Sequence, residues 1–252
     1  MILKGSMGLG DAIYLYPMVK YYSEMYPGSV TIITRYPEIY ANLNCQTAKP
    51  DEYIDCSCSA RTKEESTNIY EDTLIMSKII NKLPFKFEYD KTNQIKINSF
   101  KKICVVRNIT TPANGEEDAK VMIPKISVFQ NIINAYSGKV FFVSIGWQKS
   151  CDYKLDKIDL DLSEINVLNS YFSVIDQADI VLSQPGHCVP IAEGLNKKLF
   201  CVFARSGLKS MEKRFRFTTP QKILTKISST YCVDDEKPED YLPKFEKLLF
   251  GD

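Results

Sequence analysis

The sequence predicts an α/β fold in two halves, each organised around a strand, a glycine-containing turn and a helix. The first unit begins at Ile2 and passes through Gly8 and Gly10 into a helical pattern. In the second unit, residues 179–205, an apolar run of strand length is followed by a Pro-Gly turn, a helix and another strand. Strands and helices alternate through most of the remaining chain, which is typical of α/β domains with parallel sheets.

The composition is that of a globular protein with room for two compact halves. The chain has 252 residues, of which 44% are hydrophobic and 25% charged, with a formal net charge of +1. No apolar run is long enough to span a bilayer, and the first strand leads directly into a glycine loop, which leaves no room for a signal peptide. We therefore expect a cytoplasmic protein without a transmembrane segment. The small net charge neither requires nor excludes nucleic acid as a partner.

The eight cysteines are scattered through predicted strands and loops, so we expect reduced thiols. Cys56 and Cys58 are separated by one residue instead of two, and the single histidine, His187, is far away in sequence. The Asp-Leu-Asp stretch at residues 159–161 lies near lysines, and we interpret it as a solvated loop. The sequence therefore predicts no metal site and no cofactor.

The first half shows a regular order of elements. Its hydrophobic pattern predicts strands at residues 2–4, 30–35 and 53–55 and helices at 12–26, 37–43 and 70–83. The glycine order is GxxGxG instead of the GxGxxG of a dinucleotide fold, and Arg35 stands where that fold carries an acidic residue. A simple NAD site is therefore excluded. Asp11 stands at the expected N-cap of the first helix, where its carboxylate would accept backbone N–H bonds.

A stretch rich in Lys, Asn and Thr, residues 89–102, separates the two halves. We therefore expect an N-terminal domain at 1–100, a second domain at 101–225, and a C-terminal segment at 226–252 whose helix packs back on the N-terminal domain. For the second half, the pattern predicts strands at 103–106, 139–145, 180–182 and from 199, and helices at 126–135, 165–176, 189–195 and 238–250.

The Pro-Gly turn of the second half has the form of a phosphate-binding unit. The backbone N–H groups of Gly186, His187 and Cys188 would lie at a helix N-terminus, where free donors and the helix dipole favour an anion. An ordinary strand–helix–strand crossover fits this stretch as well. Arg107, directly after the strand at 103–106, would face whatever binds at that strand end.

Both stretches resemble the GT-B glycosyltransferases, which bind nucleotide-diphospho-sugars between two Rossmann-like domains facing a central cleft. The opening GLGDAIYLYPMVKYYSEMYPGSVTIITR is similar to the lipopolysaccharide heptosyltransferase family, in which a proline follows the aspartate of a G-x-G-D loop by six residues, as Pro17 follows Asp11. The stretch YFSVIDQADIVLSQPGHCVPIAEGLNKKLFCVFA is similar to the family's second half. The family usually has Asp-Thr-Gly with a histidine three residues after the glycine, whereas here Gln-Pro-Gly is followed at once by His187.

The resemblance implies which residues act on the acceptor. Asp11 would be the general base that takes the proton of the acceptor hydroxyl, beside the loop glycines Gly8 and Gly10. The alternative role of the Asp11 carboxylate is to cap the helix, and one carboxylate cannot fully serve both roles.

The resemblance also implies a donor site. Arg107, Lys120 and the N–H groups of residues 186–188 would surround the diphosphate in place of a divalent metal ion. Lys120 lies in a stretch similar to the family's K-x-W-P motif, and Glu193 ends a stretch that resembles the P-x-x-E signature of other GT-B enzymes, whose glutamate binds the donor ribose. His187 would bind a phosphate or cap the turn, and the alternative for Arg107 and Lys120 is a solvated surface charge.

Together these features predict a metal-independent glycosyltransferase that moves a sugar from a nucleotide-diphospho-sugar to an acceptor hydroxyl. The acceptor would be a surface glycan or glycolipid, or a hydroxylated base of DNA as in some viral GT-B enzymes. The basic run at residues 209–216 would suit a phosphate backbone, while the near-neutral net charge argues against a dedicated duplex binder. The alternatives are a noncatalytic nucleotide-sugar binding module, favoured by the altered glycine turn, and a GT-B nucleotide-sugar epimerase.

Overall fold

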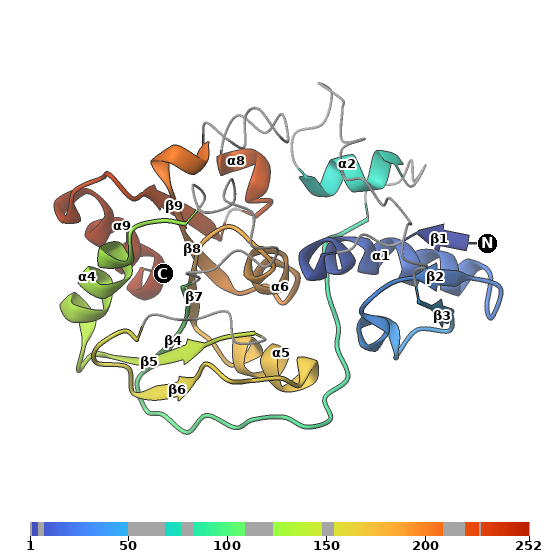
Figure 1. The fold of residues 1–252 in the computed structure, drawn as a ribbon, viewed down its shortest axis with the longest axis horizontal. Coiled ribbons are helices and arrows are strands. Elements are labelled where there is room, and N and C mark those ends of the chain that lie inside the picture. Colours follow the sequence, from blue (N-terminus) through green and yellow to red (C-terminus); the bar gives the residue numbers. More distant parts are fainter. Residues whose placement is uncertain are drawn as a thin grey trace.

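The structure is a computed structural model, and it describes residues 2–4, 8–49, 69–76, 83–108, 123–147, 154–208, 220–226 and 228–251. Within these ranges the chain forms two parallel β-sheets (Figure 1). The strands of the first sheet precede the connecting segment at residues 83–101, and those of the second sheet follow it.

The first sheet has the strand order β1-β2-β3, with neighbouring strands parallel. Its strands and the helices beside it are β1 (Ile2–Lys4), α1 (Leu9–Met25), β2 (Thr31–Ile33), the 3-10 helix η1 (Pro37–Tyr40), β3 (Gln46–Ala48) and α2 (Ile69–Met76). The strand predicted at residues 53–55 lies outside the described residues. β3 was not predicted, because its side chains are exposed and carry no apolar pattern.

The second sheet has six parallel strands in the order β6-β5-β4-β7-β8-β9. Its elements are β4 (Lys102–Arg107), α4 (Ile126–Tyr136), β5 (Val140–Ile145), β6 (Leu160–Leu162), α5 (Leu168–Asp176), β7 (Ile180–Ser183), α6 (Cys188–Gly194), β8 (Lys198–Phe203), α8 (Pro220–Ile223), β9 (Ser229–Val233) and α9 (Pro238–Phe250). The chain winds outward from β4 in one direction and from β7 in the other. In such sheets, ligands bind at the carboxyl ends of the strands where the winding reverses.

Alternating side chains of the second sheet enter two different cores. In β7, Ile180 and Leu182 belong to a core shared with α4 and α9, whereas Val181 belongs to the core shared with α5 and α6. All three side chains are fully buried. This explains why the strand is a continuous apolar run, as expected for a parallel sheet covered on both faces.

The closing helix α9 packs on the second sheet, so the prediction that it packs back on the N-terminal domain is wrong. Phe245 contacts Phe200 of β8 and Tyr136 of α4, with ring centroids 5.4 and 5.3 Å apart. The Tyr136 hydroxyl donates to the Leu242 carbonyl, and Asn131 donates to the Tyr241 hydroxyl. The apolar stripe correctly predicted an amphipathic helix, but the surface it covers is set by β9, which brings the chain to the edge of the second sheet just before α9 begins.

The Asp-Leu-Asp stretch is also corrected, because its leucine begins an edge strand instead of lying in a solvated loop. β6 pairs in parallel with β5. Asp159 accepts a 2.8 Å hydrogen bond from the Phe142 backbone N–H, and Asp161 accepts one of 3.0 Å from Ser163. Both carboxylates therefore satisfy backbone donors at the ends of the strand.

The connecting segment joins the two halves through buried aromatic side chains. Its Phe87 ring contacts Tyr16 of α1 and Phe172 of α5, with centroids 5.2 and 4.9 Å apart. The segment is extended, and the Phe87 N–H donates to the Gly194 carbonyl at 2.9 Å while the Ile95 N–H donates to Ser173 Oγ at 3.0 Å. In Figure 1 it runs from beside α1 past α5 to β4. One core cluster therefore includes residues of both halves.

Among the described helices, none combines the length and the apolar character that a bilayer crossing requires.

Candidate functional site

The first turn of α1 packs directly against the first turn of α6, so the two predicted strand–turn–helix units meet in space. A Cβ atom added at Gly10 would lie 3.3 Å from His187 Cα and 3.4 Å from Pro190 Cγ. A larger residue at position 10 would therefore push the two helices apart. The candidate acceptor-side loop and the candidate donor-side turn lie next to each other because position 10 is a glycine.

Arg107 is the most unusual residue at this junction. It is the last residue of β4, pairs in register with Ser183 of β7, and lies where the winding of the second sheet reverses. Its side chain is only 2% exposed, and neither Nε nor Nη1 has a hydrogen-bond partner among the described residues. Buried guanidinium groups are normally paired, since an uncompensated buried charge costs several kcal/mol. The alternative that Arg107 is a solvated surface charge therefore does not hold.

The Arg107 guanidinium lies against the turn that precedes α6. A Cβ atom at Gly186 would be 3.5 Å from Arg107 Nη1, and Gly186 has φ of +153°, which residues with a side chain rarely adopt. Gly186 is exposed and Cys188, the first residue of α6, is buried. The arginine therefore lies directly beneath an exposed glycine turn, and a planar guanidinium suits phosphate oxygens.

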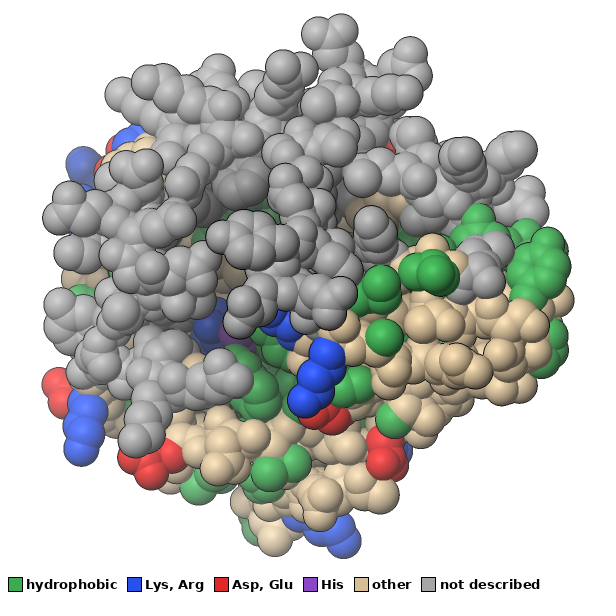
Figure 2. Space-filling model, turned by 45° about the vertical axis from the view of Figure 1, so that its right-hand side comes forward, with side chains coloured by type: hydrophobic (Ala, Val, Ile, Leu, Met, Phe, Trp, Pro, Cys, Tyr) green, Lys and Arg blue, Asp and Glu red, His purple; other side chains and the backbone are tan. Residues whose placement is uncertain are grey.

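His187 lies beside Arg107 and is held by a buried network. Its Nε2 atom is 3.0 Å from the Tyr171 hydroxyl of α5, which is also 3.0 Å from Cys188 Sγ. Burial and the neighbouring Arg107 guanidinium both hold the pKa of His187 well below 6.5, so its imidazole is neutral at pH 7. The His187 side chain makes no cap hydrogen bond to α6. Figure 2 shows the histidine in purple beside basic side chains in blue.

Asp11 is the third residue of α1, not its N-cap, which corrects the predicted capping position. Gly8 is the N-cap residue, and a Cβ atom there would lie 2.8 Å from Asp11 Oδ2, so the carboxylate lies back over the start of the helix. An acidic group in the first turn is favoured by the helix dipole. Asp11 is half-buried and follows Gly10, the residue that contacts the His187 backbone. The structure thus brings Asp11 close to the turn that carries His187.

Glu193 has a different role in this structure from the predicted ribose contact. Its carboxylate is fully buried and accepts hydrogen bonds from the backbone N–H groups of Thr225 and Lys226 and from the hydroxyls of Thr225 and Ser229. Burial raises the pKa of Glu193 above 4.5, while these donors lower it. Both carboxylate oxygens of Glu193 accept hydrogen bonds from the chain between α8 and the start of β9. Neither oxygen is left for a ribose hydroxyl.

Two predicted basic features lie outside the described residues. Lys120 belongs to residues 109–122, and the basic run occupies residues 209–216. Their roles stay predictions.

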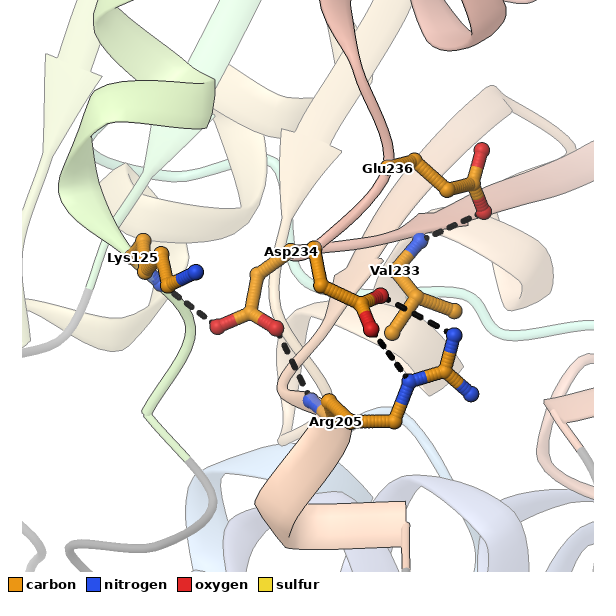
Figure 3. Close-up of polar contacts among 6 residues, drawn as sticks. Lys125, Arg205, Val233, Asp234 and Glu236 are labelled. Carbon is orange, nitrogen blue, oxygen red and sulfur yellow. Dashed lines mark hydrogen bonds and ion pairs between the residues drawn. The ribbon is translucent and has the colours of Figure 1, made fainter.

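Asp234 holds three segments of the second half together and was not predicted from the sequence. Its two carboxylate oxygens accept hydrogen bonds from the backbone N–H groups of Arg205, after β8, and Lys125, before α4 (Figure 3). Asp235 forms an ion pair with the Arg205 side chain at 2.7 Å. Asp234 thus joins the carboxyl ends of β8 and β9 to the start of α4. A single aspartate after a strand has no sequence signal for this role.

A cavity of about 350 Å³ lies at the other end of α1, with Lys20, Glu24 and Glu88 in its lining. Lys20 and Glu88 form an ion pair at 3.1 Å. The two carboxylates outnumber the one ammonium, so this cavity is poorly suited to an anion, in contrast to the region around the Arg107 guanidinium. In the part of the chain that is described, no three His, Cys, Asp or Glu side chains gather as a metal site would require.

The two parallel sheets, joined through one core and contacting at α1 and α6, define a GT-B fold, as the sequence predicted. No protein family matches the sequence, and no curated protein does. Solved structures do match. The ADP-heptose LPS heptosyltransferase II of E. coli has a TM-score of 0.67 at 10% identity, over 98% of this chain and 98% of that one.

Two further heptosyltransferase structures are similar. The E. coli heptosyltransferase WaaC with ADP has a TM-score of 0.62 at 10% identity, over 98% of this chain and 99% of that one. The dodecameric iron-containing glycosyltransferase TibC from enterotoxigenic E. coli has a TM-score of 0.60 at 9% identity, covering 91% of this chain. The chain spans 61% of the length of TibC. At such identities the likeness demonstrates the fold alone.

Proposed function

We propose that this protein is a glycosyltransferase that moves a sugar from a nucleotide-diphospho-sugar to an acceptor hydroxyl without a metal ion. The observation that carries the proposal is Arg107, a buried guanidinium with unpaired donors among the described residues, at the strand ends where GT-B folds hold their donor. A diphosphate would supply the negatively charged partner that this guanidinium lacks among the described residues. The WaaC structure was solved with ADP, which supports a nucleoside diphosphate as the leaving group.

The proposed reaction forms a bond from the acceptor oxygen to the anomeric carbon and breaks the bond from that carbon to the diphosphate. Asp11 takes the proton of the acceptor hydroxyl. Arg107, His187 and the backbone N–H groups of the Gly186 turn stabilise the charge that grows on the diphosphate, with Lys120 as a further contact. In this assignment Glu193 holds the chain after α8, and the ribose contact is not assigned to it.

The acceptor is proposed to be a glycan or glycolipid hydroxyl, since the similar solved structure of the E. coli enzyme is an LPS heptosyltransferase. The version in which hydroxylated DNA bases are the acceptor predicts that acceptor binding weakens steeply with salt. An acceptor affinity that is flat between low and high salt removes the DNA version.

Donor binding is tested by thermal shift with UDP-, GDP-, ADP- and CMP-sugars. A ligand at 100 times its dissociation constant adds about 2.7 kcal/mol of stability. Arg107→Gln should abolish the shift, because it removes a charge-assisted contact to phosphate. Arg205→Gln is the matched control, since this exposed arginine pairs with Asp235 and should leave the shift intact. Equal shifts in both variants would contradict the donor site.

Catalysis is tested at Asp11. Asp11→Asn should lower the rate by about 10²–10⁴-fold through loss of the base, with the donor dissociation constant unchanged. Loss of the charge from the first turn of α1 should cost only about 0.3–1 kcal/mol of stability. Near-full turnover in Asp11→Asn would show that the carboxylate serves only the helix.

A turnover assay distinguishes the proposed enzyme from a noncatalytic nucleotide-sugar binding module, which the altered glycine turn would also suit. Release of nucleoside diphosphate from a sugar nucleotide, with water or an acceptor, supports the enzyme. Intact binding with no release from any sugar nucleotide supports the module.

A further inference from the structure

We propose that Tyr171 is a positioning residue, which holds the His187 imidazole in the tautomer that presents an N–H group to the donor diphosphate. This inference rests on the proposed function, because the proposed donor supplies the diphosphate that His187 would bind. It concerns the proton on one ring nitrogen and can be measured separately from activity.

The Tyr171 hydroxyl lies within hydrogen-bond distance of two atoms that differ in strength as acceptors. The Tyr171 side chain is fully buried, and its oxygen is 3.0 Å from His187 Nε2 and 3.0 Å from Cys188 Sγ. An unprotonated imidazole nitrogen is a strong acceptor, whereas a thiol sulfur is a weak one. The tyrosine proton therefore goes to His187 Nε2.

Cys188 completes this arrangement as a donor. Burial raises the pKa of the Cys188 thiol, so the sulfur keeps its proton at pH 7 and can donate it to an oxygen such as that of Tyr171. Donation then runs from Cys188 to Tyr171 and from Tyr171 to His187. The Tyr171 hydroxyl, His187 Nε2 and Cys188 Sγ then each have a partner.

The protonation of the other ring nitrogen, Nδ1, follows from the charge of the imidazole. His187 is neutral because of its burial and of the Arg107 guanidinium beside it. A neutral imidazole whose Nε2 accepts a hydrogen bond carries its proton on Nδ1. An anion bound by Arg107 thus meets a second donor in His187, whereas the other tautomer would present a lone pair to it.

The chain has a single histidine, so imidazole NMR signals from labelled protein belong to His187 alone. With ¹⁵N- and ¹³C-labelled histidine at pH 7.5, the wild-type protein should show the proton on Nδ1. Tyr171→Phe should move it to Nε2, the form that free histidine prefers. A wild-type signal with the proton on Nε2, or an unchanged tautomer in Tyr171→Phe, would overturn the inference.

Two control variants separate positioning from a general loss of packing. Tyr40→Phe removes a buried hydroxyl that donates to the Ala12 carbonyl, and it should leave the His187 tautomer unchanged. Cys188→Ala keeps the contact between Tyr171 and His187 and should also leave it unchanged. If either control shifts the tautomer as Tyr171→Phe does, the positioning role is wrong. The wild-type spectrum still tests the position of the proton if a variant fails to fold.

Binding of inorganic pyrophosphate, measured by calorimetry at pH 7.5, connects the tautomer to the site. Tyr171→Phe should bind about tenfold more weakly than wild type, as for loss of one hydrogen bond to the anion. Tyr40→Phe should bind as wild type does, and Arg107→Gln should not bind. Unchanged affinity in Tyr171→Phe, despite a moved proton, would mean that His187 does not contact the anion. If wild type binds neither pyrophosphate nor ADP, the proposed donor site fails while the NMR result still decides the tautomer.

Discussion

At the scale of single residues, Arg107 carries opposite consequences for stability and for binding. Its buried charge lacks a partner among the described residues, so Arg107→Met should raise the free energy of unfolding of the ligand-free protein by about 1–4 kcal/mol. The same change should abolish nucleotide binding. Denaturant unfolding with and without a sugar nucleotide measures both effects. A less stable Arg107→Met protein would show that the guanidinium is satisfied without a ligand.

Glu193 makes the stability of the protein depend on pH. Its pKa in the folded state lies above the unfolded value of 4.5, so the folded state binds more protons just above pH 4.5. The Glu193 contribution is therefore most favourable below pH 4.5 and is lost as pH rises through the folded-state pKa. Between pH 5 and pH 8, wild type should lose more stability than Glu193→Gln in urea unfolding. Parallel curves for the two proteins would contradict a raised pKa.

Some residues near the candidate site can be predicted from local sequence patterns, and others cannot. The predictions for Gly10, Arg107 and His187 came from a glycine turn and a strand end, which are local patterns. Tyr171 could not be found, since it reads as one more apolar residue of a helix until the fold sets its hydroxyl beside His187. Glu193 fits a local motif, yet its carboxylate binds donors more than thirty residues away in sequence.

At the scale of elements, the approach of α1 to α6 depends on a missing side chain. Replacing a glycine inside a helix by alanine usually stabilises it by about 0.5–1 kcal/mol. Gly10→Ala should instead destabilise the protein, because the new Cβ would lie 3.3 Å from the His187 backbone. Calorimetric melting of this variant checks the sign. A raised melting temperature would mean that the contact between the helices is loose.

The buried strands of the second sheet were predicted well, and its edge strands were not. The strands β4, β5, β7 and β8 are buried on both faces and therefore carry continuous apolar runs. The edge strands β6 and β9 are short or half-exposed, so their sequences resemble loops. The strand β9 leads the chain to the second sheet just before α9 begins. Because β9 was not predicted, the packing of α9 was predicted on the wrong domain.

At the scale of the whole molecule, Phe87 links the cores of the two halves. Its side chain is 2% exposed and contacts rings from α1 and α5. Phe87→Ala should cost about 3–5 kcal/mol of stability. Wild type should unfold in one cooperative transition, and the variant in two, since the halves would then share less buried surface. Scanning calorimetry distinguishes the cases, and a single transition in Phe87→Ala would show that other contacts couple the halves.

The buried guanidinium of Arg107 loses most of its water during folding, before any ligand arrives. Because the chain itself strips water from this cation as it folds, an arriving diphosphate meets a charge that no longer has to be dehydrated. A charge enclosed in this way is screened only weakly by dissolved ions. The protein should therefore hold its donor across a wide range of ionic strength, and a salt-sensitive step in its cycle would have to lie with the acceptor.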